Sequence, residues 1–206
     1  MSTFNTLASV ESTENTIKNL ISNGFMAEVV ETKSEALEKI KEYIPAGASI
    51  HNGASVTLDQ IGYIDYLKSG AHSWKNLHAD ILAETDPAKQ AELRHKSVFS
   101  DFYLGSAHAI SETGEIVIAS NTGSQLPHLV YTSPNIILVA STQKITPTLA
   151  DAIKRLEEYV VPLEDKRSLE AYGANTMQAK TLIMHKENSY LGRKVRIIFV
   201  NELLGY

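Results

Sequence analysis

The order of its segments limits the fold of this chain more than any other feature. Short runs rich in β-branched residues alternate with amphipathic segments that begin at capping residues and end at glycine or proline. Strands are expected at about 26–30, 48–50, 102–104, 116–119 and 136–140, and helices at about 14–23, 57–68 and 86–96, from 32 to a break at 45, and from 146 onward. This repeated order of strand and then helix predicts an α/β domain with a mostly parallel sheet and helices on both faces.

Local patterns add three further predictions. Thr32–Glu35 and Thr57–Gln60 each have the spacing of a capping box, in which the first and fourth side chains satisfy two free backbone N–H groups at the start of a helix. The segments 180–187 and 194–200 flank the turn sequence SYLG at 189–192 and are interpreted as a closing β-pair. Gly24 ends the first helix, so we expect residues 1–24 to form an N-terminal helical segment that packs on the domain.

Composition and charge agree with one domain over residues 1–206. The chain has 206 residues, of which 43% are hydrophobic, and can therefore bury one substantial core. Its 19 basic residues are scattered among 24 acidic ones, which disfavours nucleic-acid binding, because such binding needs a clustered basic surface. No run approaches the roughly 18 apolar residues of a membrane span. The N-terminus lacks the basic and apolar regions of a secretion signal, and we expect a cytoplasmic protein.

The chain has no cysteine, which excludes several kinds of site. Without a thiol it cannot hold a conventional iron–sulfur cluster, a zinc site that uses cysteine, or a disulfide. Its histidines follow no metal-binding spacing, so no metal site is predicted and the cofactor stays unknown. A redox role would require another protein to carry the electrons.

The stretch Ser100–Pro134 is the strongest candidate for a ligand-facing site. It places Glu112 just before an apolar, β-prone run, between turns of small residues whose glycines allow a ligand to approach the backbone closely. Glu112 could act as a nucleophile, as a proton carrier tuned by His51, His108 or His128, or as a hydrogen-bond acceptor. The alternative is an ordinary hairpin with a solvated carboxylate. The candidates in this stretch are Glu112 as the catalytic residue and, as ligand-binding residues, Gly105, Thr113, Gly114, Asn121, Gly123, Ser124 and His128.

The loop at 52–57 is the second half of the candidate site. It follows an expected strand and precedes an expected helix, whose N-terminus offers unpaired N–H groups to a phosphate or a carboxylate. In doubly wound sheets such loops lie at the carboxyl ends of the strands, where ligands bind. The alternative is an ordinary capped helix, since every helix has such an end. The ligand-binding candidates in this loop are Asn52, Gly53, Ala54, Ser55 and Thr57.

Several motifs, in this order along the chain, resemble the lactate-utilisation domain (LUD) family. They are GASVTLDQIG at 53–62, LGSAHAISETGEIV at 104–117, NTG at 121–123, LP at 126–127, NIILVASTQKITPTLADAI at 135–153 and IIFVNELLGY at 197–206. The resemblance implies a Rossmann-like fold of the ribose-5-phosphate isomerase and CoA-transferase-like superfamily, in which small-residue loops hold phosphate or acyl-CoA groups. It also implies the cluster-free type of LUD protein, which works beside iron–sulfur proteins in lactate oxidation.

The chain departs from the family pattern in two places. Many relatives have an arginine shortly after the Gly/Asn turn, where this chain has Ser124, Gln125 and His128, which puts an anion clamp built on that arginine in question. The segment 173–192 also differs from the corresponding family segment. Lys144 follows the family's pattern of a strand and then a lysine, at the edge of the site. It is nevertheless interpreted as a solvated surface charge, as are Lys75, Arg94 and Arg155.

The sequence thus predicts a LUD-domain protein of lactate or related organic-acid utilisation. It would bind a small anionic metabolite or a phosphate-bearing cofactor between the loops at 52–57, 105–114 and 121–124. One alternative is a stand-alone acyl-CoA transferase or sugar-phosphate isomerase that uses Glu112. Another is a non-catalytic subunit that docks an iron–sulfur partner protein, and a homo-oligomer is compatible with each alternative.

Overall fold

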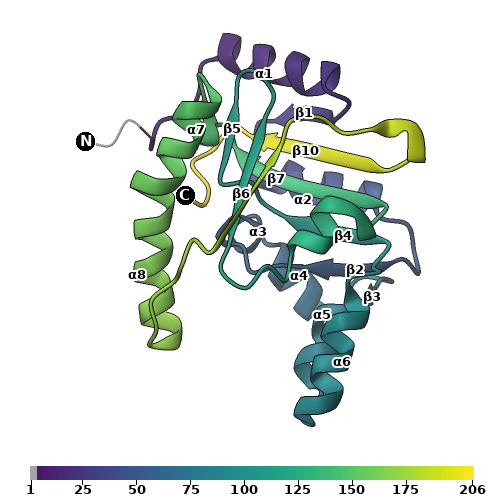
Figure 1. Ribbon diagram of the computed structural model, residues 1–206. Helices are drawn as coiled ribbons and strands as arrows, with labels where there is room; N and C mark the ends of the chain where they lie inside the picture. Colours follow the sequence, from purple (N-terminus) through teal and green to yellow (C-terminus); the bar gives the residue numbers. More distant parts are fainter. Residues whose placement is uncertain (1–3) are drawn as a thin grey trace.

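The computed structural model describes residues 4–206 and contains two β-sheets (Figure 1). Residues 1–3, the start of the expected N-terminal segment, lie outside the described residues. In the described part of the chain, the strands of the larger sheet all run parallel and are, in order across the sheet, β1 (Met26–Val30), β10 (Lys194–Val200), β7 (Asn135–Ser141), β4 (Phe102–Gly105), β2 (Ser49–Asn52) and β3 (Lys75–Asn76). The predicted α/β fold with a mostly parallel sheet is confirmed.

The central strands β7 and β10 are apolar on both faces of the larger sheet. Ile137 and Ile198 belong to one buried core, whereas their neighbours Leu138 and Phe199 belong to a second core. Successive side chains of a strand point to opposite faces, so each of these strands contributes to both cores. A near-continuous apolar run of this kind is typical of a strand buried on both sides in a parallel sheet.

One face of the larger sheet is covered by α2 (Lys33–Tyr43), α3 (Val56–Gln60) and α4 (Tyr63–Ser69). The capping box at the start of α2 is confirmed, because the Thr32 side chain accepts from the Glu35 backbone N–H and the Glu35 side chain accepts from the Thr32 backbone N–H. This start aims the apolar stripe of α2 at the sheet, where Ile40 is fully buried.

The second predicted capping box is wrong, and so is the single helix at 57–68. Ser55, rather than Thr57, caps the helix, because its side chain accepts from the backbone N–H of Leu58. Gly62 then adopts φ +81°, a left-handed conformation that favours glycine, and divides the segment into the short helices α3 and α4. Thr57 is therefore free of a capping role and lies inside the first turn of α3.

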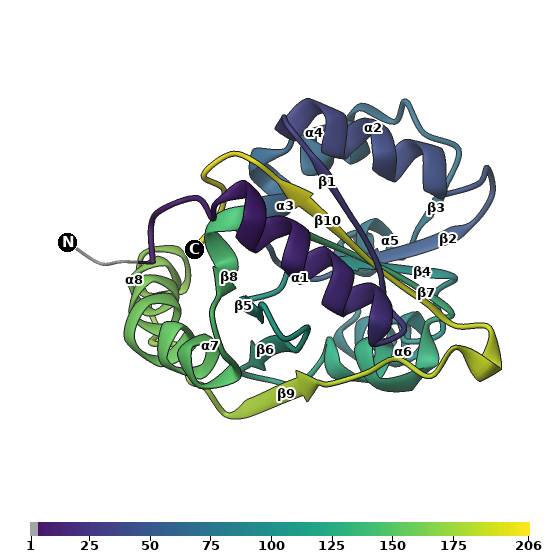
Figure 2. The ribbon, with the colours of Figure 1, turned by 90° about the horizontal axis from the view of Figure 1, so that it is seen from above.

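The other face of the larger sheet is covered by α1 (Val10–Ser22) and by a smaller sheet (Figure 2). Across the described part of the smaller sheet the strands are β8 (Ile145–Thr146), β5 (Ala109–Ser111), β6 (Ile116–Ser120) and β9 (Lys180–Met184). A long helical segment closes the outer side of the smaller sheet and consists of α7 (Leu149–Arg155), the π-helical turn η3 (Leu156–Val160) and α8 (Val161–Tyr172). The larger sheet is thus layered between helices on one side and a helix plus a second sheet on the other.

The predicted closing β-pair between residues 180–187 and 194–200 is wrong. β9 pairs antiparallel with β6 in the smaller sheet, whereas β10 lies parallel between β1 and β7 in the larger sheet. The two segments are close in sequence but belong to different layers. The apolar side chains of β10 fill the buried centre of the larger sheet. A hairpin of the two segments at the edge of the sheet would leave this centre unfilled.

A pair of helices, α5 (Leu77–Ala83) and α6 (Pro87–Ser97), projects from the edge of the larger sheet near β2 and β3 (Figure 1). The Asp86 side chain caps α6 by accepting from the N–H groups of Ala88 and Lys89, as the Asp-Pro start of this segment predicts. Within residues 4–206, no helix is both long enough and apolar enough to cross a membrane.

Candidate functional site

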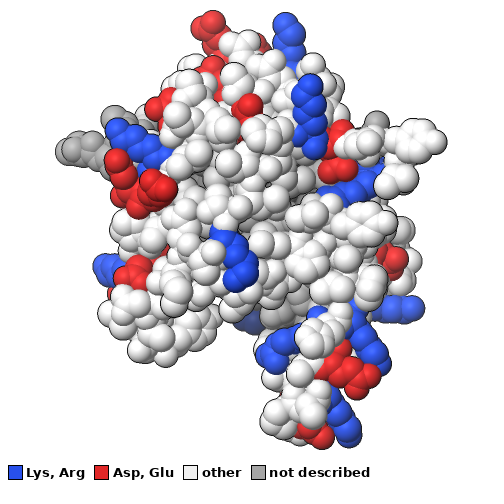
Figure 3. Space-filling model, viewed as in Figure 1, with Lys and Arg blue, Asp and Glu red and all other residues white. Residues whose placement is uncertain are grey.

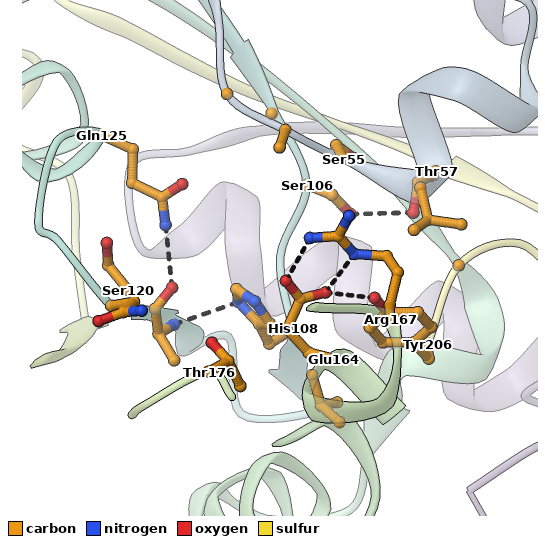
Figure 4. A pocket seen from close by; sticks show the side chains of 18 of the residues that line it. Ser55, Thr57, Ser106, His108, Ser120, Gln125, Glu164, Arg167, Thr176 and Tyr206 are labelled. Atoms are coloured by element: carbon orange, nitrogen blue, oxygen red, sulfur yellow. Dashed lines mark hydrogen bonds and ion pairs between the residues drawn. The ribbon is translucent and has the colours of Figure 1, made fainter. Parts of the chain in front are cut away.

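A cavity of about 720 Å³ opens at the carboxyl ends of the parallel strands. Four strand ends contribute to its wall: Asn52 ends β2, Gly105 ends β4, Lys144 follows β7, and Gly205 follows β10. Helix α8 and the loop at 119–125 close its sides (Figure 4). Ligands of open α/β sheets bind at this end of the strands, so the cavity is the candidate ligand site.

Eight of the residues expected to bind a ligand line this cavity. They are Asn52, Gly53, Ala54, Ser55, Thr57, Gly105, Asn121 and Ser124. Gly53 packs so closely that a Cβ atom there would lie 2.6 Å from the hydroxyl of Tyr103. A larger residue would therefore displace either the loop at 52–57 or the Tyr103 ring.

Four other expected binding residues do not line the cavity. Gly123 lies at the base of its turn, where a Cβ would lie 2.9 Å from Cδ of Lys180. His128 is buried behind the cavity wall, with its ring stacked on Tyr103. Thr113 and Gly114 lie at the tip of the β5–β6 hairpin, where their carbonyl groups are contacted by the Asn23 amide. A site centred on the cavity therefore does not include these four residues.

Glu112 is also outside the cavity wall. Its carboxylate accepts a 2.6 Å hydrogen bond from the hydroxyl of Ser12, and its backbone carbonyl accepts one of 2.6 Å from Asn19, so the residue is fixed against α1. β5 begins at Ala109, directly after the cavity-lining residue His108, and an extended strand advances about 3.3 Å per residue, so Glu112 lies roughly 13 Å beyond His108. The structure thus places Glu112 beyond the far end of β5, outside the cavity wall.

We expect Glu112→Ala to leave ligand binding unchanged and to lower the free energy of unfolding by about 1 kcal/mol, the usual net value of one hydrogen bond. The physical reason is the loss of the Ser12 contact that holds α1 on the hairpin. Chemical denaturation would measure the stability change. Loss of ligand affinity in a stably folded Glu112→Ala protein would contradict this structural role.

Lys144 is the most unusual residue of the cavity wall. It is only 2% exposed, and its Nζ donates to Thr57 Oγ1 at 3.1 Å, to Ser106 Oγ at 3.0 Å and to the Ala107 carbonyl at 3.1 Å. No carboxylate in the described part of the chain forms a salt bridge with it. Burial, and then the charge of Arg155, lower the pKa of Lys144 to about 7. The interpretation of Lys144 as a solvated charge is therefore wrong.

Arg155 is a second buried cation beside the cavity. It is fully buried, donates to the backbone carbonyl of His108 at 2.5 Å and stacks over the Tyr159 ring at 5.1 Å. Its Nε and Nη2 have no hydrogen-bond partner within residues 4–206. Burial lowers the pKa of Arg155 to about 10. Arg155, like Lys144, is not the solvated charge expected from the sequence, whereas Lys75 and Arg94 are exposed.

The side of the cavity formed by α8 holds a compact ionic group (Figure 4). Arg167 binds Glu164 through two hydrogen bonds of 2.8 and 2.6 Å, and the hydroxyl of Tyr206 also donates to Glu164. These contacts hold the pKa of the Glu164 carboxyl below its usual value and raise that of the Arg167 guanidinium. Glu164 and Arg167 therefore satisfy each other's charge, whereas the buried cations Lys144 and Arg155 have no carboxylate partner among the described residues.

A stack of aromatic rings lies behind the loop at 52–57. His128 stacks on Tyr103 and on His51, with ring centroids 4.6 and 5.0 Å apart, and His51 lies 5.7 Å from His78. Burial lowers the pKa of His51 to about 4 and that of His128 to about 3, each helped by a neighbouring histidine. Tyr103 and His78 reach the cavity wall, so the stack supports the wall from behind.

The distribution of charged residues on the outer surface does not mark the position of the cavity. Figure 3 shows acidic and basic side chains interspersed on the face seen in Figure 1. Among residues 4–206, no group of three or more histidine, aspartate or glutamate residues is arranged to hold a metal ion. The feature that distinguishes this site is a pair of buried cations beside a cavity whose wall also carries several hydroxyl groups.

The family model of the LUD domain matches residues 13–189, which include the loops at 52–57 and 105–108, Lys144 and the whole of α8. The chain belongs to the LUD domain family. Among solved structures, the LUD domain resembles the crystal structure of a DUF162 family protein from Deinococcus radiodurans. The TM-score is 0.58 over 95% of this chain and 100% of that chain, at 12% sequence identity. At this identity the likeness concerns the fold alone. No curated protein matches the sequence.

The segments in which this LUD domain departs from the family pattern still contribute to the cavity. Ser124 and Gln125 line it where many relatives have an arginine, and Thr176, Met177 and Gln178 line it from the altered segment at 173–192. The contributions of Ser106, Glu164, Arg167 and Tyr206 to the cavity wall could not be predicted from the sequence patterns. The burial of Arg155 could have been predicted from the sequence, because Arg155 lies three residues after Ala152 on the apolar face of its helix.

Proposed function

We propose that this LUD domain binds a small anionic metabolite or a phosphate-bearing cofactor in the cavity, with Lys144 as the main charged contact. The observation that carries the proposal is a buried ammonium group in the cavity wall that has no carboxylate partner among the described residues. Buried charges in proteins are normally paired, because removal of an ion from water is costly. An anionic ligand would provide the missing partner.

The surroundings of Lys144 favour an anion over a cation. Arg155 adds a second buried positive charge, and Glu164 is already neutralised by Arg167. Hydroxyl groups of Ser55, Thr57, Ser106 and Ser120 also lie in the wall, where they can donate to ligand oxygens. The cavity is much larger than a three-carbon acid needs, so it has room for a metabolite together with a cofactor or for a single larger anion.

Membership of the LUD family supports a role in lactate or related organic-acid utilisation. The chain has no cysteine, so oxidation of such an acid would need an iron–sulfur protein or another electron carrier as partner. An acyl-CoA transferase or isomerase reaction through Glu112 would need this carboxylate in the cavity, whereas it contacts α1. The proposal therefore does not assign a reaction to Glu112.

A thermal-shift screen tests this function. The panel contains lactate, pyruvate, inorganic phosphate, ribose 5-phosphate and coenzyme A. An anion at about 100 times its dissociation constant should stabilise the wild-type protein by roughly 2.7 kcal/mol, which raises the melting temperature by about 5–10 °C for a chain of this length. We expect Lys144→Met to lose this shift, because methionine fills the same space without a charge.

The matched control is Lys75→Met, which removes an exposed lysine outside the cavity wall and should keep the shift. The melting temperature of ligand-free Lys144→Met shows whether this variant is folded. An anion shift of wild-type size in Lys144→Met, or the absence of any shift across the panel, would contradict the proposal.

A further inference from the structure

We infer that His108 acts in this site as a neutral hydrogen-bond donor, whose Nε2–H contacts an oxygen of the ligand next to the anionic group held by Lys144. This inference rests on the proposed function and deepens it. It assigns a binding residue and a class of ligand, namely an anion that carries a further acceptor oxygen close to its charged group.

The hydrogen bond on the other side of the ring sets the tautomer of His108. The backbone N–H of Ala119 donates to Nδ1 of His108 at 3.1 Å. A backbone N–H group can only donate, so Nδ1 must act as an acceptor and carry no proton. The proton of the neutral imidazole is then on Nε2. In this arrangement His108 cannot accept a proton at Nε2 as a general base, but it can donate a hydrogen bond from Nε2.

The Nε2–H group of His108 is available to a ligand. His108 lines the cavity, and Figure 4 shows its ring near Glu164, on the side of the cavity formed by α8. No protein group within residues 4–206 accepts a hydrogen bond from Nε2. A donor that faces a cavity without a protein acceptor is suited to an oxygen of the ligand.

The charged groups around His108 keep its ring neutral. Lys144 after β7 and Arg155 on α7 are positive and disfavour a second cation, whereas Glu164 on α8 acts in the opposite direction. Burial is the largest effect, and together these influences lower the pKa of His108 to about 3. Protonation would also force Nδ1 to give up the hydrogen bond from Ala119. The ring is therefore a neutral donor throughout the physiological pH range.

An ammonium group and a neutral N–H donor on one wall recognise two different groups of a ligand. Lys144 offers a charge to a carboxylate or a phosphate, and His108 offers a directional hydrogen bond to a carbonyl or hydroxyl oxygen. This combination suits 2-oxo and 2-hydroxy acids and sugar phosphates. It discriminates against an anion without the second oxygen, such as propionate, because Nε2–H would then lose its acceptor.

Nitrogen NMR of the histidine rings tests the tautomer without any ligand. The signals of His108 are assigned as those lost in His108→Gln. We expect an Nε2–H ring that does not titrate between pH 8 and pH 6, the range in which the protein stays folded. A proton on Nδ1, or a titration near pH 6.5, would overturn the inference even if an anion binds.

Binding measurements test the contact itself. We expect pyruvate to bind more tightly than propionate if the ligand is a carboxylate, and ribose 5-phosphate to bind more tightly than inorganic phosphate if it is a phosphate. In His108→Met the affinity for the preferred anion should fall about tenfold, which corresponds to one hydrogen bond. His108→Gln should keep most of the affinity, because its amide can donate from a similar position.

Both variants lose the imidazole that accepts from Ala119, and only His108→Gln keeps a side-chain N–H donor. Equal losses in His108→Gln and His108→Met, or a His108 Nε2 signal that does not move when an anion binds, would overturn the inference. Failure of the proposed function gives a different result. In that case no anion binds to the wild-type protein, or Lys144→Met binds the anion as well as the wild type does.

Discussion

Lowering the pH from 7 to 4.5 is expected to remove most of the folding stability of this protein. The groups responsible are the buried imidazoles of His51, His108 and His128, whose pKa values are lowered to about 4, 3 and 3. The unfolded chain binds a proton at each of these histidines near pH 6.5, whereas the folded chain keeps them neutral. The unfolded state therefore binds more protons below pH 6.5.

The stabilising effect of these histidines is complete above pH 6.5 and is lost as the pH falls toward their folded pKa values. Each group can contribute a slope of up to about 1.4 kcal/mol per pH unit, and three groups together up to about 4 kcal/mol per pH unit. A domain of this kind has a stability of about 5–15 kcal/mol. We therefore expect acid unfolding between about pH 6 and pH 4, measured by urea denaturation at a series of pH values.

Two variants separate the histidine contribution from general acid effects. His128→Phe keeps a ring in the stack with Tyr103 and His51 but cannot be protonated, so the pH slope should fall by about one third. His95→Gln changes an exposed histidine on α6 and should leave the slope unchanged. A stability that stays flat from pH 7 to pH 5 in the wild type would show that these rings are not buried as neutral groups.

The second large effect is expected for Gly205→Ala. Gly205 adopts φ +62°, and a Cβ atom there would lie 2.3 Å from Oγ1 of Thr57 and 3.1 Å from Nζ of Lys144. The left-handed backbone costs an alanine about 1 kcal/mol, and overpacking adds about 1–3 kcal/mol. We expect the free energy of unfolding to fall by about 2–4 kcal/mol, together with loss of anion binding, because Lys144 and Thr57 must move.

Gly70→Ala is the matched control for this substitution. Gly70 adopts φ +68°, and no atom lies within 4 Å of the position where its Cβ would be. In Gly70→Ala the free energy of unfolding should fall only by the roughly 1 kcal/mol that the left-handed backbone costs an alanine. The affinity of this variant for the anion should be unchanged. Denaturation curves and the thermal-shift assay on both variants provide the comparison. Equal effects of the two substitutions would show that the segment at 201–206 does not support the site.

The parts of the fold that depend on neighbouring residues could be predicted from the sequence. The capping box at Thr32 formed as expected, because both of its hydrogen bonds lie within four residues of chain. The partner of the segment 194–200 could not be predicted in this way. Its place between β1 and β7 is decided by residues far away in the sequence, and proximity to the segment 180–187 led to a wrong pairing.

In the candidate site, too, local features could be predicted from the sequence, whereas features that depend on distant residues could not. The loop at 52–57 could be identified from its small residues between an expected strand and an expected helix, and the structure lines the cavity with it. The turn around Glu112 has the same small-residue pattern, but the direction of β5 brings Glu112 into contact with Ser12 of α1 instead. Lys144 was recognised by its position after a strand, yet its burial could not be predicted, because lysine is almost always exposed unless its charge is paired.

Proton uptake on anion binding tests the central claim most directly. Lys144 has a pKa of about 7 in the free protein, so it is about 90% neutral at pH 8, and a bound anion should hold it in the charged form. Titration calorimetry at pH 8, in two buffers of different ionisation enthalpy, measures this uptake for an anion that is fully ionised at that pH. The account predicts net proton uptake, of up to about one proton per bound anion. Binding without proton uptake would contradict it, because the anion would then not contact the ammonium group of Lys144.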